Sequence, residues 1–200
     1  MGAIFLTIQQ QYMPQLFMVL VGCRPKGRHT EQHDVFFGIG EHLEDIKPQL
    51  LAFWPNAGKI HIDAWRTVTA VNGYQIDVVP RNKKKAKTNQ LFFLNLGGYK
   101  QAEMEEYHYK ILEVATEKSK AIAAAKKTTF FKHTGFKGAE SHIDDQYGVD
   151  VDDIMNVADI LPTAIKKEWQ LQIKPNKQLV ADVLHLGYLK WEKIGKTIAR

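Results

Sequence analysis

Apolar and polar residues alternate along most of this chain in short runs that are typical of β-strands. Two of the clearest runs, residues 16–21 and 91–96, each end at a glycine, Gly22 in the first and Gly97 in the second. The two glycines lie 75 positions apart (97 − 22 = 75). A shared pattern at a fixed distance indicates an internal repeat.

The same register continues beyond the glycines. Glu31-Gln32-His33 falls on Glu106-Tyr107-His108 at the 75-residue offset, and a further apolar run follows in each copy. His61-Ile62-Asp63 matches His142-Ile143-Asp144 at an offset of 81 (142 − 61 = 81). The larger offset requires a longer loop in the second copy, and loops accept such insertions at little cost.

A helix is expected between the second and third strands of each copy. Residues 117–127 are rich in alanine and follow Thr116, a residue type that favours helix N-termini. Residues 41–53 carry the matching helix of the first copy, which Pro48 weakens or kinks.

The third and fourth strands of each copy are expected to form a hairpin. Asn72-Gly73 suits the positive φ angles of a type I′ turn, and the second copy has Asp152-Asp153 at the equivalent place. Each copy therefore reads strand, strand, helix, strand, strand. Two more strands are expected in the C-terminal tail, at 169–173 and 184–191.

These elements predict an α+β fold: two tandem repeats of a strand-strand-helix-strand-strand unit, with one or two mostly antiparallel sheets and a C-terminal strand extension. The expected organisation is a flexible N-terminal extension over 1–13, repeat unit 1 over 14–80, a basic linker over 81–90, repeat unit 2 over 91–161, and a C-terminal extension packing on the repeats over 162–200.

Composition narrows the class of protein. Hydrophobic residues make up 44% of the 200 positions, enough for a sizeable core, and the formal net charge is +5. Cys23 is the only cysteine, so the chain forms no internal disulfide and offers no cysteine-based zinc site. No apolar run reaches the roughly 18 residues that span a bilayer, so we expect a cytoplasmic protein without membrane association.

Four stretches carry a resemblance to a known family. They read Leu-Phe-Met-Val-Leu-Val-Gly at 16–22, Glu-Gln-His-Asp-Val-Phe-Phe at 31–37, His-Ile-Asp-Ala-Trp at 61–65 and Val-Asn-Gly-Tyr at 71–74. This wording resembles the bacterial family known as domain of unknown function 1543. The resemblance implies one or two copies of the family's unit, covering residues 16 to about 160 here, and it implies no activity.

Two acid and histidine pairs are the main candidates for chemistry. Glu31 and His33 stand two positions apart, as do His61 and Asp63, so on strands each pair presents a carboxylate and an imidazole on one face. If the strands are neighbours, the four groups can hold a divalent metal such as zinc or manganese, or relay a proton. The alternative is structural, with each imidazole satisfied by a carboxylate. Because both copies carry the pattern, we prefer the structural interpretation.

The loop from Cys23 to Thr30 is the clearest difference between the copies. It places basic residues just past a strand end, where cations and backbone amides can hold a phosphate or carboxylate. The candidate anion-binding residues are Arg24, Lys26, Arg28 and His29. We expect Cys23 to be a small apolar residue at the strand end rather than a nucleophile with a lowered pKa.

Three functions remain open on the sequence alone. We prefer a non-catalytic module that binds a small anionic ligand or a protein partner, with a homo-oligomer as one such partner and no cofactor. The second hypothesis is a metal-dependent or acid–base enzyme using Glu31, His33, His61 and Asp63, although the sequence assigns no catalytic residue. The third is weak nucleic-acid binding through the lysine-rich stretch 83–87, which we disfavour because no stacking aromatic residues are interleaved there.

Overall fold

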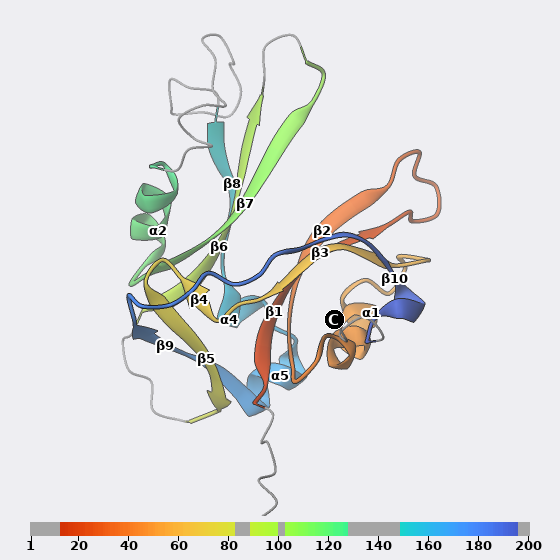
Figure 1. Ribbon diagram of the computed structural model, residues 1–200. Helices are drawn as coiled ribbons and strands as arrows, with labels where there is room; N and C mark the ends of the chain where they lie inside the picture. The colour runs from red at the N-terminus through yellow and green to blue at the C-terminus, as the bar shows by residue number, and fades with distance from the viewer. Residues whose placement is uncertain (1–12, 83–88, 100–102, 128–148, 196–200) are drawn as a thin grey trace, which may run out of the picture.

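A computed structural model describes residues 13–82, 89–99, 103–127 and 149–195. In this part of the chain, ten strands form one four-stranded and two three-stranded sheets (Figure 1). Every pairing of neighbouring strands is antiparallel. The predicted α+β class with mostly antiparallel sheets is confirmed, although the structure has three sheets where one or two were expected.

The four-stranded sheet has the order β10-β3-β1-β2. Its strands are β1 (Gln15–Cys23), β2 (Gln32–Gly40), β3 (His61–Thr67) and β10 (His185–Lys190). Alternate residues of β1 point to opposite faces, so Phe17, Val19 and Val21 are buried on the face covered by the helices that follow β2. The opposite face of β1 packs toward the other two sheets.

The helix predicted over 41–53 is divided into two parts. A 3-10 helix, η1 (Leu43–Ile46), leads into the α-helix α1 (Lys47–Phe53). Pro48 stands in the first turn of α1, where the missing N–H has no intrahelical partner to lose. Pro48 therefore marks the start of a helix and does not kink a longer one.

A second sheet has the order β7-β6-β8. Its strands are β6 (Gln90–Tyr99), β7 (Glu106–Ala115) and β8 (Val149–Asn156). The helix α2 (Lys118–Ala125) buries Ala121 and Ala125 against one face of β6. Its N-cap residue is Glu117, one position later than the predicted Thr116.

The remaining sheet has the order β4-β5-β9. Its strands are β4 (Ala70–Val71), β5 (Tyr74–Pro80) and β9 (Trp169–Pro175). The predicted hairpin turn between β4 and β5 is confirmed, because Asn72 and Gly73 have φ angles of 48° and 82°.

The prediction of a corresponding turn at Asp152-Asp153 in the second half is wrong. Asp152 and Asp153 lie inside β8, and the chain then enters the helices α4 (Val157–Ile160) and α5 (Thr163–Glu168). The strand that pairs with β5 is instead β9, from the C-terminal tail. Among the described residues, the second half therefore does not repeat the five-element unit of the first.

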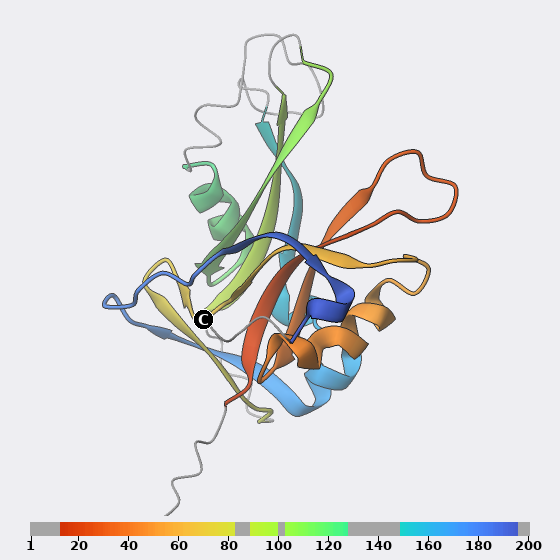
Figure 2. The same ribbon diagram turned by 45° about the vertical axis from the view of Figure 1, so that its right-hand side comes forward.

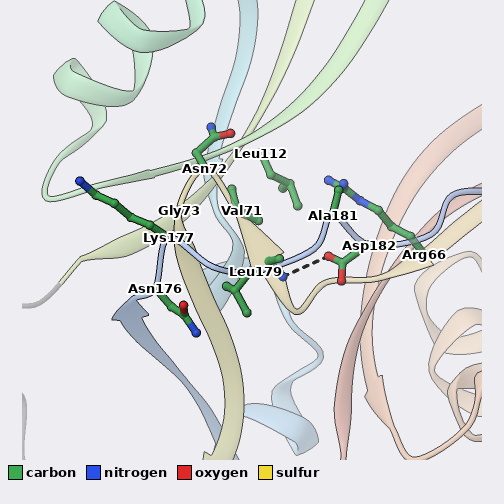
Figure 3. Close-up of a pocket in the computed structure, with 11 residues that line it drawn as sticks. Arg66, Val71, Asn72, Gly73, Leu112, Asn176, Lys177, Leu179, Ala181 and Asp182 are labelled. Carbon is green, nitrogen blue, oxygen red and sulfur yellow. Dashed lines mark hydrogen bonds between the residues drawn. The ribbon is translucent and has the colours of Figure 1, made fainter.

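Both strands predicted in the C-terminal tail are confirmed, and they join different sheets. Between them, Asp182 fixes the tail to the point where the chain passes from β3 to β4. Its carboxylate accepts hydrogen bonds from Thr69 N at 2.9 Å and Ala70 N at 3.1 Å, and from Thr69 Oγ1. Figure 3 shows this anchor beside a hollow that Arg66 also lines.

The main core lies where the three sheets meet. One buried cluster contains Leu16, Phe37, Val78 and Phe93. The ring centroids of Phe37 on β2 and Phe93 on β6 lie 5.6 Å apart, so this cluster connects the β1–β2 pair with the β6–β7 pair. Away from this core, the β1–β2 and β6–β7 strand pairs diverge in both views (Figures 1 and 2).

Some expectations fall outside the described residues. These are the N-terminal extension up to residue 12, the lysine-rich stretch 83–88 of the linker, and the motif His142-Ile143-Asp144. Within the described ranges, none of the helices has the length and apolar character needed to cross a membrane.

Candidate metal centre

The two acid and histidine pairs of the first half converge on one point. The Nε2 of His61 lies 2.5 Å from Glu31 Oε1 and 3.4 Å from Asp63 Oδ1, while the Nε2 of His33 lies 3.3 Å from Asp63 Oδ2 and 3.9 Å from Glu31 Oε1. One ligand atom from each residue lies within 4.8 Å of all the others. We call these four residues the first cluster.

Two of these separations suit a metal ion at the centre. Nitrogen and oxygen ligands at about 2.0–2.2 Å from zinc lie about 3.3–3.6 Å from one another in tetrahedral geometry, and both histidines are at this distance from Asp63. Glu31 lies 2.5 Å from His61 and 3.9 Å from His33, so its side chain would shift to share the ion. Two imidazoles and two carboxylates form a mixed donor set that zinc, iron(II) and manganese(II) all accept.

His61 is the most informative member of the first cluster. Only 6% of the residue is exposed, and its buried Nε2 makes no hydrogen bond despite the nearby oxygen of Glu31. The buried Oδ2 of Asp63 likewise makes no hydrogen bond. A buried polar group without a hydrogen bond costs about 1–3 kcal/mol, so a structural pairing would be expected to align the N–H with an oxygen. Here the carboxylate oxygen is close to Nε2 but outside hydrogen-bond geometry.

The sheet register explains how the rings come together. Gly22 of β1 stands directly between His33 on β2 and His61 on β3. A Cβ at this position would overlap the Nε2 of His61 and lie 2.7 Å from Asp63 Oδ2. The first cluster therefore fills the space that the missing side chain of Gly22 leaves open.

An irregularity in β3 brings in the second carboxylate. The register of β1 against β3 shifts between Leu20 and Val21, where Ala64 and Ile62 are the partners and Asp63 is left between them. A β-bulge of this kind redirects a side chain and is common beside functional sites. Asp63 consequently reaches the same point as His61, from two positions further along the strand.

Tyr188 covers the buried histidine from the neighbouring strand. Its ring centroid lies 4.4 Å from that of His61, and Tyr188 is 63% exposed. The register of β10 against β3 is irregular between Leu186 and Leu189, and Gly187 has a φ of 117°. This bulge turns the tyrosine over the imidazole and shields one side of the first cluster.

The remaining side of the first cluster is open. About 43% of the Glu31 side chain and 46% of the His33 side chain are exposed. His33 also lines a hollow of about 330 Å³ between the two divergent strand pairs, together with His108 and Lys110 of β7. Burial lowers the pKa of the Lys110 ammonium, and the negative charge of Asp34 offsets part of that effect. A small molecule in this hollow would lie against histidines from both halves.

The basic loop does not form a comparable site. Arg24, Lys26, Arg28 and His29 are all exposed in the loop between β1 and β2. The Nε of Arg24 donates to the backbone oxygen of Arg28 at 3.4 Å, so its guanidinium is directed at its own loop. Anion binding by these four residues stays a prediction.

Cys23 follows Gly22 on β1 and is fully buried. Burial raises the pKa of its thiol, and the charge of Glu31 raises it further. A nucleophilic cysteine requires the opposite shift. This agrees with the expectation that Cys23 is an apolar core residue.

The fold and the first cluster define an α+β protein with a candidate metal centre. Residues 28–78 match the model of the Domain of Unknown Function (DUF1543) family, which confirms the family that the sequence resembles. All four residues of the first cluster lie in the matched segment. The match does not extend to the second half of the chain.

A solved structure supports the fold. The crystal structure of a protein Il1583 from Idiomarina loihiensis is similar with a TM-score of 0.60, over 88% of this chain and 97% of that chain, at 20% sequence identity. At this identity the similarity concerns the fold alone. The search of curated proteins found no match.

Proposed function

We propose that this protein binds one divalent transition-metal ion through Glu31, His33, His61 and Asp63. The observation that carries the proposal is the buried Nε2 of His61, which lies 2.5 Å from a carboxylate oxygen without a hydrogen bond. A cation relieves this arrangement, because it accepts the nitrogen lone pair and neutralises both carboxylates. The metal hypothesis thereby replaces our sequence-based preference for a purely structural role.

The exposure of the first cluster favours a reactive ion over a purely structural one. Four protein ligands close a tetrahedral zinc site, so water or substrate reaches the ion here only if an exposed ligand dissociates or the coordination number rises to five. Glu31 and His33 are almost half exposed, and His33 lines the hollow between the strand pairs. A bound ion would supply Lewis-acid chemistry at the rim of this hollow.

A cobalt titration tests the proposal. Untagged protein, stripped of metal with a chelator, is titrated with Co²⁺ and followed by visible absorbance, which reports on ligand type and geometry. We expect one tight Co²⁺ per chain with imidazole ligation. His33→Ala should weaken this phase by about 10- to 100-fold or more, because it removes a direct ligand.

His29→Ala is the matched control. His29 stands four positions before His33, is exposed in the loop, and lies outside the first cluster. We expect the His29→Ala variant to titrate like the unmodified protein. Equal cobalt binding by the unmodified protein and both variants would mean that the first cluster holds no metal.

A further inference from the structure

A second group of side chains in the other half resembles the first cluster. Glu106, His108 and Asp152 each offer a ligand atom, and these atoms lie within 4.8 Å of one another. The His108 Nε2 lies 3.9 Å from Glu106 Oε2 and 3.2 Å from Asp152 Oδ2. The corresponding distances around His33 are 3.9 Å and 3.3 Å. We call these three residues the second cluster.

The strand register is the independent observation that links the clusters. Gly97 of β6 pairs with His108 on β7, as Gly22 pairs with His33. The β6–β8 register shifts between Asn95 and Leu96, which are 75 positions after Leu20 and Val21, where the β1–β3 register shifts. The same bulge in the same place therefore directs Asp152 as it directs Asp63.

Glycine makes room for the second cluster as it does for the first. A Cβ at Gly97 would overlap Asp152 Oδ2 and lie 2.7 Å from Asp152 Oδ1. Glycine inside a strand weakens the sheet and is usually tolerated where another group must approach closely. At Gly97 the group that approaches is Asp152, and at Gly22 it is His61 together with Asp63.

The clusters differ at one register position. Opposite Gly22 on β3 stands His61, whereas opposite Gly97 on β8 stands Asp150. By strand register, the position equivalent to His61 is thus at an offset of 89 (150 − 61 = 89), whereas the sequence matched His61 with His142, which lies outside the described residues. Within the described residues, the strand that carries this position is β8, Val149–Asn156.

We infer that Glu106, His108 and Asp152 form a second metal site, which accepts a hard divalent ion such as Mn²⁺ more readily than the first cluster does. One imidazole and two carboxylates make a donor set richer in oxygen than that of the first cluster, and carboxylate oxygens suit manganese. All three residues are exposed, so water completes the coordination. The inference concerns different residues from the proposed function and fails or succeeds separately.

Manganese binding in a His33→Ala/His61→Ala background tests the inference. This double variant removes both imidazoles of the first cluster, because His61→Ala alone would leave the same residue types that form the second cluster. Its Mn²⁺ binding is followed by the loss of the electron paramagnetic resonance signal of free Mn²⁺. We expect about one Mn²⁺ per chain in the double variant, and a loss of at least about tenfold in affinity when Asp152→Asn is added. Asp159→Asn, an exposed acid of α4 outside the second cluster, should leave binding unchanged.

The outcomes separate the two sites. Asp152→Asn alone should keep the cobalt phase of the first cluster, which also shows that the variant is folded. If the His33→Ala/His61→Ala variant binds no manganese, the second site is refuted while the first stands. Manganese binding that survives Asp152→Asn or falls equally with Asp159→Asn would also refute it, because the ion would then bind elsewhere.

Discussion

We expect zinc to raise the melting temperature of the unmodified protein by about 5–10 °C and to leave that of the His61→Ala variant nearly unchanged. A ligand present at 100 times its Kd stabilises the folded state by about 2.7 kcal/mol. For a chain of this size, each kcal/mol shifts the melting temperature by about 2–4 °C. His61 matters most among the four ligands because it is buried and fixed beneath Tyr188.

The measurement is a thermal scan of chelator-stripped protein with and without zinc, with His29→Ala as the control variant. The zinc-dependent shift is the quantity compared, so any intrinsic loss of stability in His61→Ala does not affect it. A structural role for the first cluster gives a different result. In that case zinc has no effect on the unmodified protein, and His61→Ala lowers the melting temperature in its absence.

Replacing Gly22 with alanine destabilises the protein by about 3 kcal/mol and removes metal binding at the first cluster. The added methyl group would overlap the Nε2 of His61 and crowd Asp63, in a strand paired on both sides. Overpacking of this kind typically costs about 1–3 kcal/mol. Chemical denaturation measures the loss, and the cobalt titration reports on the first cluster.

Gly27→Ala separates crowding from the general cost of replacing a glycine. Gly27 has a φ of 83° and no heavy atom within 4 Å of an added Cβ, so only backbone strain of about 1 kcal/mol is expected. This variant should bind cobalt normally. If Gly22→Ala is no less stable than Gly27→Ala and still binds cobalt, the close approach at Gly22 is not needed for the site.

Local patterns predicted much of the fold. The alternation of apolar residues predicted β1, β2, β6 and β7, and Asn72-Gly73 predicted the turn between β4 and β5. Both signals depend only on residues that are neighbours in the sequence. The pairing of β5 with β9 was not predictable in this way. It joins residues almost a hundred positions apart, and no short-range pattern encodes such a contact.

The candidate site was predicted in part. The i, i+2 spacing of Glu31 with His33 and of His61 with Asp63 put each pair on one strand face, and the structure brings both pairs together. The sequence did not reveal Tyr188, which reaches His61 through a bulge near the C-terminus.

Asp152 was missed for a different reason. The amino-acid sequence matched His61-Ile62-Asp63 with His142-Ile143-Asp144, whereas the strand register makes Asp152 the counterpart of Asp63. A signal was available in Gly22 and Gly97, which end the two apolar runs. A glycine inside a strand indicates close approach by another group, and in both sheets that group belongs to a cluster.

Elemental analysis tests the central claim most directly. The protein is purified without a histidine tag or chelator and analysed by plasma mass spectrometry, before and after incubation with zinc and desalting, beside His61→Ala. We predict about one zinc, manganese or iron per chain at the first cluster, and the loss of that equivalent in His61→Ala. Less than about 0.1 metal per chain even after zinc incubation, or equal metal in both proteins, would contradict a metal centre at Glu31, His33, His61 and Asp63.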